Sequence, residues 1–522
     1  MAAQRPQYYE NTLSLLEINV TSLAESLKEL RVAVRQGAEA IQANEPPQDK
    51  WPVGGMLKAF PGVALAFLRL DFQSSVLDED GIESLNYRKL ALERIPDGFP
   101  DIPLRASRLA PAGSFSPIAA VTLRIFSALA KENWERDAKP SISQEDISCL
   151  HDAANLALNN GPLVPHDDRN MGGDEMLYGR AGLLLVLLNI RAHQFDEKTE
   201  SALEAVYETI PRLVDIIVDA GRQGSETFIE KNGAQEAHPL MYAWMEGYYC
   251  FGAVHGITGI LPILLSAKPE EIEQHLPIIG ETVTSLCKLT LSNNGHLPMT
   301  LPPFSFGQTS ELVQLCHGSP GILILLAAAL KNPALTRESW CPDWNRATYE
   351  ASERIWEEGL ISKGGSLCHG ISGNSWPWLT LHNTFEYHSE DLEAAKSAYL
   401  QRTLASAFQN GDMSPTLTPD FFLSKALAFM LHARETRPYK NTKCADCTKD
   451  YRMPDDPYSL FEGLAGNVCA WAEACAIIQA RLRKMELTGS GASLEEDLLF
   501  QQAMRSELGF PLIGGNGAAG LV

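Results

Sequence analysis

Two Cys-His-Gly triplets carry the residue types that a zinc site requires. They span residues 316–318 and 368–370, and each opens a Gly-x-x-Gly turn. Thiolate sulfur and neutral imidazole nitrogen are the ligands that zinc prefers. All four side chains together would form a closed structural site, whereas two cysteines and one histidine would leave a fourth tetrahedral position for chemistry. The triplets by themselves leave both arrangements open.

The triplets belong to a longer series of similar turns. Seven turns recur at intervals of 52 to 93 residues, and each is followed by an apolar run that favours a helix. Glycine at such turns permits positive φ and a close approach between backbones. Residues 59–62 keep only the second glycine, and residues 114–121 form a degraded copy. The complete copies are residues 179–182, 256–259, 318–321, 370–373 and 463–466.

This repeat predicts an all-α fold. The runs after the glycines are apolar on nearly every face, so each must be covered on every face. The intervening segments 201–220, 270–291 and 346–361 mix apolar and charged residues at helical spacing. We therefore expect a double-layered α/α toroid of seven helical-hairpin repeats, with the turns and a central zinc site at one rim.

The expected domain organisation is simple. Residues 1–50 are an N-terminal segment with an outer helix, and residues 51–522 form a single toroid domain. Within it, the stretch at about 387–420 departs from the helical pattern and is expected to be an inserted surface loop.

Composition limits the classes of function. The net charge of -22 excludes a nucleic-acid surface, which needs a concentrated basic footprint. No apolar run approaches the roughly 18 residues of a membrane span, and the N-terminus lacks a secretory signal. The ten cysteines are dispersed and expected to be reduced, and Cys444 and Cys447 are interpreted as an incidental loop pair. A cytoplasmic protein is expected.

With the repeats and triplets in hand, the chain resembles the lanthionine synthetase C-like family, the eukaryotic relatives of bacterial lanthipeptide cyclases. The resemblance extends from about residue 54 to residue 466. Besides the two triplets, it is carried by Leu-Tyr-Gly-Arg-Ala-Gly at residues 177–182, His-Gly at 255–256 and Phe-Glu-Gly at 461–463. It implies an α/α toroid with one zinc ion at the centre of a rim.

The resemblance also assigns the metal ligands. Cys316, Cys368 and His369 correspond to the family's zinc ligands, whereas His317 falls at a position that does not bind zinc. An open site is therefore implied. Two residues depart from the family's sequence pattern. Leu315 replaces the usual tryptophan and is expected to alter an apolar wall of the pocket. Leu312 replaces an arginine of the bacterial cyclases.

A reaction follows from this assignment. A thiol bound at an open zinc site is a thiolate at neutral pH and can add to the β-carbon of dehydroalanine or dehydrobutyrine in a peptide or protein. The enolate that results needs a general acid. His255 corresponds to an active-site histidine of the family; its alternative interpretation is a polar side chain satisfied at a helix start. Glu175 corresponds to an active-site aspartate of the bacterial cyclases, and this resemblance implies that it orients an imidazole or shuttles a proton. The alternative interpretation is an exposed carboxylate near a helix N-terminus.

The eukaryotic family is associated with glutathione as the thiol. Its two carboxylates call for basic residues near the zinc. Lys363 matches a glutathione-contacting lysine, Arg5 resembles a second contact, and Lys425 falls where relatives have arginine. A solvated surface charge is the alternative for all three and is favoured for Lys425.

Three hypotheses follow from the sequence. The first is an enzyme, a zinc-dependent glutathione transferase that forms thioethers with dehydroamino acids. The second is a non-catalytic adaptor or sensor that binds zinc and glutathione. The third is a toroid in which zinc has a structural role only.

Overall fold

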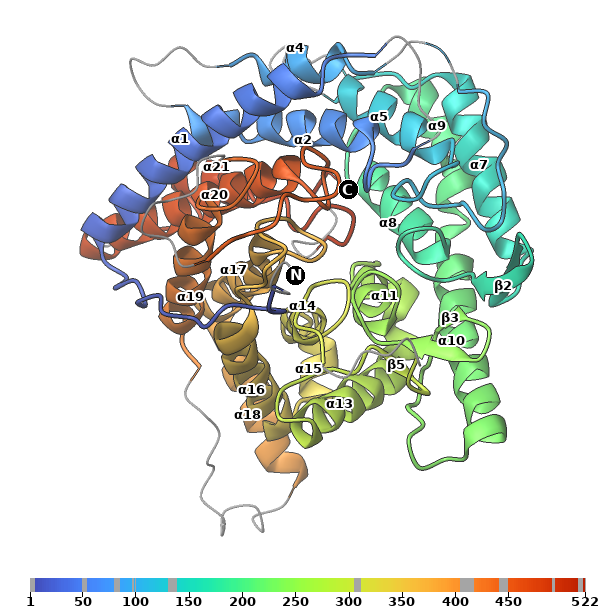
Figure 1. Cartoon of the computed structure of the whole chain (residues 1–522). Helices are drawn as coiled ribbons and strands as arrows, with labels where there is room; N and C mark the ends of the chain where they lie inside the picture. Colours follow the sequence, from blue (N-terminus) through green and yellow to red (C-terminus); the bar gives the residue numbers. More distant parts are fainter. Residues whose placement is uncertain are drawn as a thin grey trace.

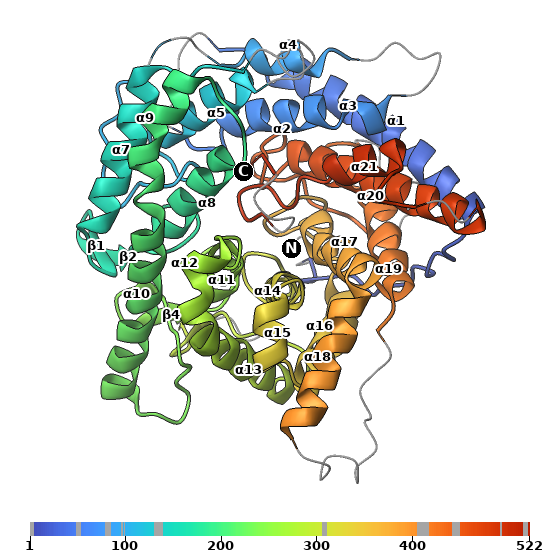
Figure 2. The ribbon, with the colours of Figure 1, turned by 180° about the vertical axis from the view of Figure 1, so that it is seen from behind.

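The computed structural model is mostly helical, which confirms the all-α class. Figure 1 shows the helices arranged in a ring, and Figure 2 shows the same ring from behind. The structure describes residues 5–48, 54–78, 85–95, 98, 100–129, 139–304, 311–403, 417–440, 449–490, 493–514 and 520–521. The Cys444–Cys447 pair lies outside these ranges.

Each of the seven predicted turns leads directly into a helix of the inner layer. These helices are buried on nearly all faces: in the third, every residue from Arg180 to Ile190 is buried. The degraded copy is also confirmed, because its helix begins at Ile118. The inner helices are α2 (Phe60–Phe72), α5 (Ile118–Ala128), α8 (Arg180–Arg191), α11 (Ile257–Leu264), α14 (Ser319–Leu330), α17 (Ile371–Tyr387) and α20 (Leu464–Ser490).

A second helix precedes each inner helix and lies outside it in the ring. These outer helices begin either at a side chain that caps the first turn, such as Asn19 or Ser143, or at a proline in the first turn. They are α1 (Val20–Asn44), α4 (Tyr87–Leu92), α7 (Gln144–Leu158), α10 (Ile210–Asn232), α13 (Leu276–Ser292), α16 (Pro342–Glu358) and α19 (Pro419–Ala433).

Packing between the layers closes the ring. An outer helix typically packs on the inner helix that precedes it, as α4 does on α2, α7 on α5, α16 on α14 and α19 on α17. The last inner helix, α20, contacts both α1 and α2, so the two ends of the repeat series meet (Figure 1). The remaining helices are short or peripheral: α3 (Ser74–Leu77), α9 (Glu197–Tyr207), α12 (Pro269–Ile272), η1 (Glu273–His275), α15 (Pro333–Ser339), α18 (Ser389–Arg402) and α21 (Leu498–Arg505).

The second glycine of the turn is required by a close approach between backbones. A Cβ atom added at Gly62 would lie 2.0 Å from the carbonyl oxygen of Met56, six residues earlier in the chain. The same clash, at 1.8 to 2.1 Å, would occur at Gly182, Gly259, Gly373 and Gly466. This explains why residues 59–62 keep only the second glycine. Positive φ, the other predicted reason, applies among these turn glycines only to Gly318, at 124°.

A small antiparallel sheet was not predicted. Its five strands pair in chain order: β1 (Leu163–His166), β2 (Arg169–Gly172), β3 (Ala243–Met245), β4 (Tyr248–Cys250) and β5 (Thr300–Leu301). Two-residue loops, with positive φ at Asp167 and Gly247, join β1 to β2 and β3 to β4. Strands of two to four residues leave too short an alternation to read from sequence. Because β2 and β4 are the last elements before the third and fourth turns, the sheet positions those turns.

The predicted outer segments differ from the helices in their boundaries. The segment 201–220 is divided between α9 and α10, because a new helix begins with Pro211 in its first turn. The segment 270–291 is interrupted in the same way before α13, and 346–361 corresponds to α16. The stretch 387–420, expected as a loop, contains helix α18, which contacts α15, whereas residues 404–416 lie outside the described ranges.

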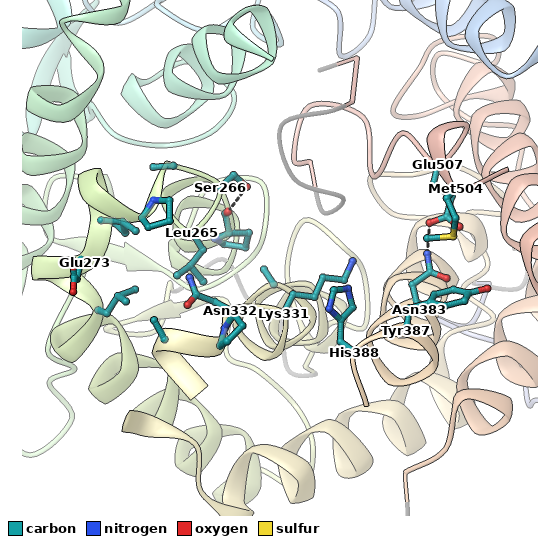
Figure 3. A pocket seen from close by; sticks show the side chains of 18 of the residues that line it. Leu265, Ser266, Glu273, Lys331, Asn332, Asn383, Tyr387, His388, Met504 and Glu507 are labelled. Carbon is teal, nitrogen blue, oxygen red and sulfur yellow. Dashed lines mark hydrogen bonds between the residues drawn. The ribbon is translucent and has the colours of Figure 1, made fainter. Parts of the chain in front are cut away.

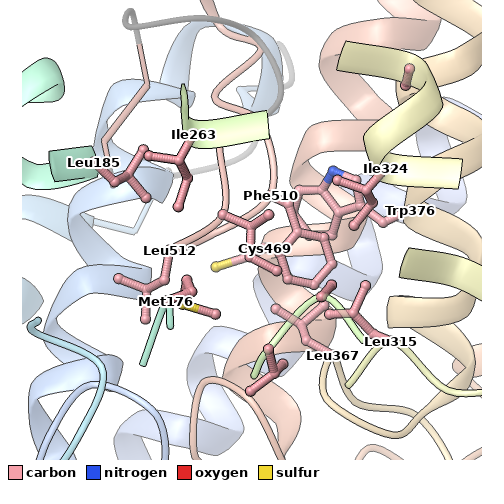
Figure 4. Close-up of a cluster of buried hydrophobic side chains, with 14 of the residues drawn as sticks. Met176, Leu185, Ile263, Leu315, Ile324, Leu367, Trp376, Cys469, Phe510 and Leu512 are labelled. Carbon is pink, nitrogen blue, oxygen red and sulfur yellow. The ribbon is translucent and has the colours of Figure 1, made fainter. Parts of the chain in front are cut away.

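A C-terminal segment fills the interior of the ring. Phe510, Leu512 and Ile513 are all nearly fully buried. Figure 4 shows Phe510 and Leu512 among side chains from several inner helices, and the Phe510 ring lies 4.8 Å from that of Trp376. Leu315, which is expected to alter an apolar wall of the pocket, is fully buried and belongs to this interior cluster. Inner helices that are apolar on all faces thus acquire a partner on the side that faces the centre.

Buried charges fix this segment to the ring. Arg69 on α2 donates to the carbonyl oxygens of Gly509 and, at 2.7 Å, Leu521. Glu473 on α20 accepts from the backbone N–H groups of Leu508 and Gly509 at 3.0 and 2.8 Å. Both side chains are almost completely buried, so these hydrogen bonds satisfy charges that would otherwise be costly to bury.

Within the described residues, no single helix is both long and apolar enough to cross a membrane. Helices α14 and α15 satisfy that test only as a pair, bent by 102°.

We predict that Phe510→Ala lowers the free energy of unfolding by about 3–5 kcal/mol, because it leaves a cavity where a buried ring packs. Urea unfolding of the full chain measures this change. Leu498→Ala is the matched control: the Leu498 side chain is 83% exposed, so its removal should change stability by no more than about 0.5 kcal/mol. A change at Phe510 as small as that of the control would show that the segment does not stabilise the ring.

Candidate metal centre

Backbone hydrogen bonds join each turn to the next around the rim. Six of the seven junctions contain a direct N–H to carbonyl bond: Ala253 to Leu315, Cys316 to Cys368, Cys368 to Phe461, Phe461 to Leu57, Leu57 to Ala112 and Gly113 to Leu177, at 2.8 to 3.3 Å. The seventh junction, between the third and fourth turns, is made by the pairing of β2 with β3. The seven turns therefore form one continuous rim.

This rim places the two cysteines side by side. Cys316 and Cys368 occupy the same position in the fifth and sixth turns, and the 3.1 Å bond from the Cys316 N–H to the Cys368 carbonyl joins them directly. The two Sγ atoms and one ring nitrogen of His369 lie within 4.8 Å of one another. Both cysteines are buried and His369 is half-buried. The three predicted metal ligands are thus brought together.

The two thiols behave as a pair that shares a proton. A hydrogen bond from Cys368, opposed by burial and helped by the nearby histidines, holds the pKa of Cys316 well below its usual range. The same hydrogen bond and burial raise the pKa of Cys368. One thiolate is therefore already favoured at this point of the rim.

Two sulfur atoms and one imidazole at these separations fit a zinc ion. Zinc takes thiolate and imidazole ligands at about 2.0–2.3 Å, so three donor atoms within 4.8 Å of one another can surround it. Among the residues that the structure describes, no carboxylate, the ligand that calcium and magnesium prefer, belongs to this cluster.

His317 lies beside the cluster, on the side of the fourth turn. Its Nδ1 is 3.9 Å from the Sγ of Cys250, and its ring stacks at 6.0 Å on the ring of His255. It is not one of the three clustered donors. In this arrangement the two triplets are not equivalent, because only the second contributes its histidine.

His255 and Glu175, predicted from separate turns, are hydrogen-bonded to each other through Nδ1 and a carboxylate oxygen. Strand β4 leads into the turn that carries His255, and β2 leads into the turn that carries Glu175. Glu175 is buried, so it is not an exposed helix-end carboxylate. The ring of Trp244, on β3, stacks on His255 at 5.1 Å, a contact that sequence reasoning missed because the sheet was not predicted.

This pairing determines the charge of the imidazole. Burial acts to lower the pKa of His255, but the charge of Glu175 and its hydrogen bond, together with the charge of Cys316, outweigh burial and raise it. His255 is therefore protonated to a higher pH than an ordinary histidine, as a proton donor at neutral pH requires.

Basic residues gather at one side of the rim, where the N-terminal segment passes. Lys363 is close enough to act electrostatically on Cys368 and His317. The N-terminal segment is held beside it, because the N–H of Ser362 donates to the carbonyl of Gln7 at 3.0 Å. Arg5, two residues before Gln7 in the sequence, forms an exposed 2.8 Å ion pair with Asp450.

Arg452 belongs to the same group and was missed. Its backbone N–H donates to the carbonyl of Ser362 at 2.9 Å, which brings the residue beside the segment that carries Lys363, and its guanidinium forms an exposed ion pair with Asp455. Nothing in the local sequence distinguishes this arginine from a surface charge, since only the hydrogen bond between two distant segments brings it to the rim.

Lys425, in contrast, contacts other residues. It lies on α19, and its ammonium pairs with Glu353 at 3.0 Å. The rings of Trp356 and Phe421 lie 4.7 and 4.9 Å from the ammonium. Only 3% of the residue is exposed, so it is not a solvated surface charge either. These contacts already satisfy the charge of Lys425.

A further ion pair on the rim was also missed. Lys58 in the first turn pairs with Glu462 in the seventh at 2.5 Å, and both Glu462 and Cys368 act to raise the pKa of Lys58. In most of the turns, an ionisable or polar side chain occupies the position directly before the first turn glycine. His255, His317 and His369 all occupy this position. Comparing the seven turns position by position would have revealed this pattern.

The fold and the rim define a ring-shaped helical protein with a candidate metal centre. A family described as lanthionine synthetase C-like protein matches residues 125–420. The chain is 26% identical over 348 residues to the Glutathione S-transferase LANCL1 of Danio rerio, which covers 66% of this chain and 68% of that protein. It is 26% identical over 314 residues to the LanC-like protein GCL1 of Arabidopsis thaliana, covering 60% and 58% respectively.

The chain therefore belongs to the lanthionine synthetase C-like family. The matched region contains the three clustered donors, His255, Glu175 and Lys363. Arg5 and Lys425 lie outside it.

We predict that the purified chain holds about one zinc ion, that Cys316→Ala and Cys368→Ala each lose it, and that His317→Ala retains it, because three donors suffice at an open site. Elemental analysis by mass spectrometry measures the zinc content. His317 is the matched control, a histidine of the same triplet motif outside the cluster. Loss of zinc from His317→Ala to the same extent would indicate a closed four-ligand site.

Proposed function

We propose that this protein adds the thiol of glutathione to dehydroalanine or dehydrobutyrine residues of peptides or proteins and so forms a thioether. The observation that carries the proposal is the position of the Cys316–Cys368–His369 cluster beside the His255–Glu175 pair. The printed name of the zebrafish relative, a glutathione S-transferase, supports the choice of thiol. The other two hypotheses explain the cluster but leave the pair without a role.

The addition forms a bond from sulfur to the β-carbon, breaks the π bond, removes a proton from the thiol and places a proton on the α-carbon. Cys316, Cys368 and His369 would hold the zinc ion. When bound, zinc lowers the pKa of the substrate thiol, so that its thiolate is available at neutral pH.

His255 would supply the proton for the α-carbon. Glu175 accepts the hydrogen bond from Nδ1, which leaves Nε2 for the substrate and keeps the ring protonated. The rings of Trp244 and His317 lie 5.1 and 6.0 Å from that of His255 and 6.1 Å from each other, and both contacts restrict the orientation of the imidazole. Glu175 is thus a positioning residue, since it acts through His255.

Lys363, Arg5 and Arg452 would bind the carboxylates of glutathione. All three lie near the segment 360–363, which leads into the sixth turn and its metal ligands. The Arg5–Asp450 pair is exposed and therefore weak, so Arg5 can exchange its partner for a ligand carboxylate. Lys425 would have to break a buried pair with Glu353 to do the same.

Mass spectrometry should detect a thioether adduct when the protein is incubated with glutathione and a dehydroalanine peptide. We expect His255→Ala to slow adduct formation by about a hundredfold or more, because the general acid is lost, with zinc and glutathione still bound. His296→Ala is the matched control: His296 makes a similar pair with Glu358, at 3.1 Å, on α16.

No adduct above background from a zinc-loaded protein would reject the enzyme and leave the adaptor or sensor hypothesis. Full activity of His255→Ala would reject the assignment of the acid while leaving the reaction in place.

Steady-state kinetics distinguish the proposed glutathione contact Arg452 from Lys425. We expect Arg452→Ala to raise the KM for glutathione by about tenfold with little change in kcat, because it removes a binding contact remote from the reacting atoms. Lys425→Ala should leave KM unchanged and lower the melting temperature, because its charge is satisfied within the fold. The opposite pattern in steady-state kinetics would restore Lys425 as the glutathione contact.

A further inference from the structure

Two cavities outside the metal cluster differ in how their charges are satisfied. The first, of about 650 Å³, lies where α11, α14 and α17 end, and Figure 3 shows the side chains that line it. Glu507 in this cavity accepts a hydrogen bond from Asn383 and acts electrostatically on Lys331. The charges of the first cavity are therefore satisfied within the protein.

The second cavity, of about 730 Å³, lies on the small sheet and is acidic. Both hairpin loops line it, with Asp167 and Asp168 between β1 and β2 and Glu246 between β3 and β4. Among the described residues that line it, Arg169 is the one cation, and its guanidinium contacts the sulfur of Met245 at 3.8 Å. Three carboxylates thus share the lining with one guanidinium.

In the described part of the chain, no ion pair with a lysine or arginine neutralises these carboxylates. Glu246 accepts a hydrogen bond at 2.9 Å from the amide of Asn170, which carries no charge. Asp167 lies 3.6 Å from the Nε2 of His166. The guanidinium of Arg108 donates to that same nitrogen at 2.9 Å, so the imidazole is neutral. The acidic side chains of the cavity are exposed and favour a cationic partner.

A row of aromatic rings joins this cavity to His255. Tyr248 and Phe304 line the cavity, and their rings lie 4.7 Å apart. The Phe304 ring lies 5.6 Å from that of Trp244, which stacks on His255 at 5.1 Å. All three aromatic residues are half-buried, so part of each remains accessible. Figures 1 and 2 both show β2 and the strands beside it further from the centre of the ring than α11, so this aromatic row leads outward from the imidazole.

The aromatic row has the length of a short peptide segment. Its three ring-to-ring steps cover at most about 15 Å, which four or five residues of an extended chain span at about 3.3–3.6 Å each. The row belongs to the third and fourth turns, whereas Lys363 and the N-terminal segment lie at the sixth. A peptide on the row would therefore leave the proposed glutathione contacts free.

We propose that the aromatic row and the acidic cavity bind the peptide substrate and select one with a lysine or arginine four or five residues from the dehydroamino acid. This inference rests on the function proposed above and names its substrate class. The peptide packs on the aromatic row, and its basic side chain enters the cavity, where Asp168 and Glu246 pair with it and the Tyr248 ring offers a cation–π contact.

Matched dehydroalanine peptides test this selection. They carry two arginines, two glutamines or two glutamates at the fourth and fifth positions, either before or after the dehydroalanine, and mass spectrometry follows the glutathione adducts. We expect arginine on one of the two sides to raise kcat/KM about fivefold over glutamine, through KM, because exposed ion pairs form, and glutamate to lower it. The preference should disappear at about 0.5 M salt, which screens exposed charges. Equal kcat/KM for arginine and glutamine peptides on both sides would overturn the proposal and leave the reaction in place.

Two double variants locate the selection. Asp168→Asn with Glu246→Gln removes two carboxylates from the cavity, and we expect it to lower kcat/KM for the arginine peptide to the level of the glutamine peptide. Glu495→Gln with Glu496→Gln is the matched control, because it changes the net charge equally at exposed positions before α21. The same loss in the control would show an effect of net charge alone and overturn the proposal.

Fluorescence polarisation separates the peptide surface from the reaction. A labelled peptide with alanine in place of dehydroalanine cannot react, so its binding is measured without turnover. We expect the arginine version to bind about fivefold more tightly than the glutamine version, and Tyr248→Ala to weaken both, because it shortens the aromatic row. Such binding by a protein that forms no adduct would reject the reaction and support the peptide surface. Equal binding of the two versions would reject the surface.

Discussion

The rest of the structure depends on the continuous rim of backbone hydrogen bonds that joins the seven turns. The inner helices lack side-chain caps where these are described, so their first N–H groups need other acceptors. Backbone carbonyls of the turns supply them: Arg180, Thr258, Ile371 and Leu464 each donate to the residue seven positions earlier. Each of these turns therefore folds back against the first residues of the helix that follows it. At the second glycine the backbone six residues earlier lies so close that a Cβ atom would clash with its carbonyl oxygen.

This constraint also accounts for the location of the chemistry. Helix N-termini carry partial positive charge, which stabilises thiolates and other anions. Seven such ends meet at one rim. The cluster of Cys316, Cys368 and His369 and the His255–Glu175 pair lie on this rim. The opposite rim, where the inner helices end, has the reverse polarity and carries the cavity lined by Asn383 and Lys331.

The repeat made most of the fold predictable, because an apolar run after each glycine turn marks every inner helix, including the one that begins at Ile118. The repeat placed the two triplets in neighbouring turns, and the resemblance to the family then selected Cys316, Cys368 and His369 among their four donors. Contacts between distant segments were not. Arg452 reaches the rim through one backbone hydrogen bond to Ser362, and Trp244 reaches His255 through a sheet whose strands have only two to four residues. Neither residue has a local pattern that identifies it.

The C-terminal segment links these two rims physically. Inner helices that are apolar on every face would expose their central sides in an empty ring, and Phe510, Leu512 and Ile513 cover them. Because Arg69 and Glu473 hold this segment from two different inner helices, the filled interior also fixes the spacing of those helices. The spacing of the inner helices sets the spacing of the turns at their ends. A well-packed interior is thus a condition for holding two thiols and an imidazole at metal-binding distance.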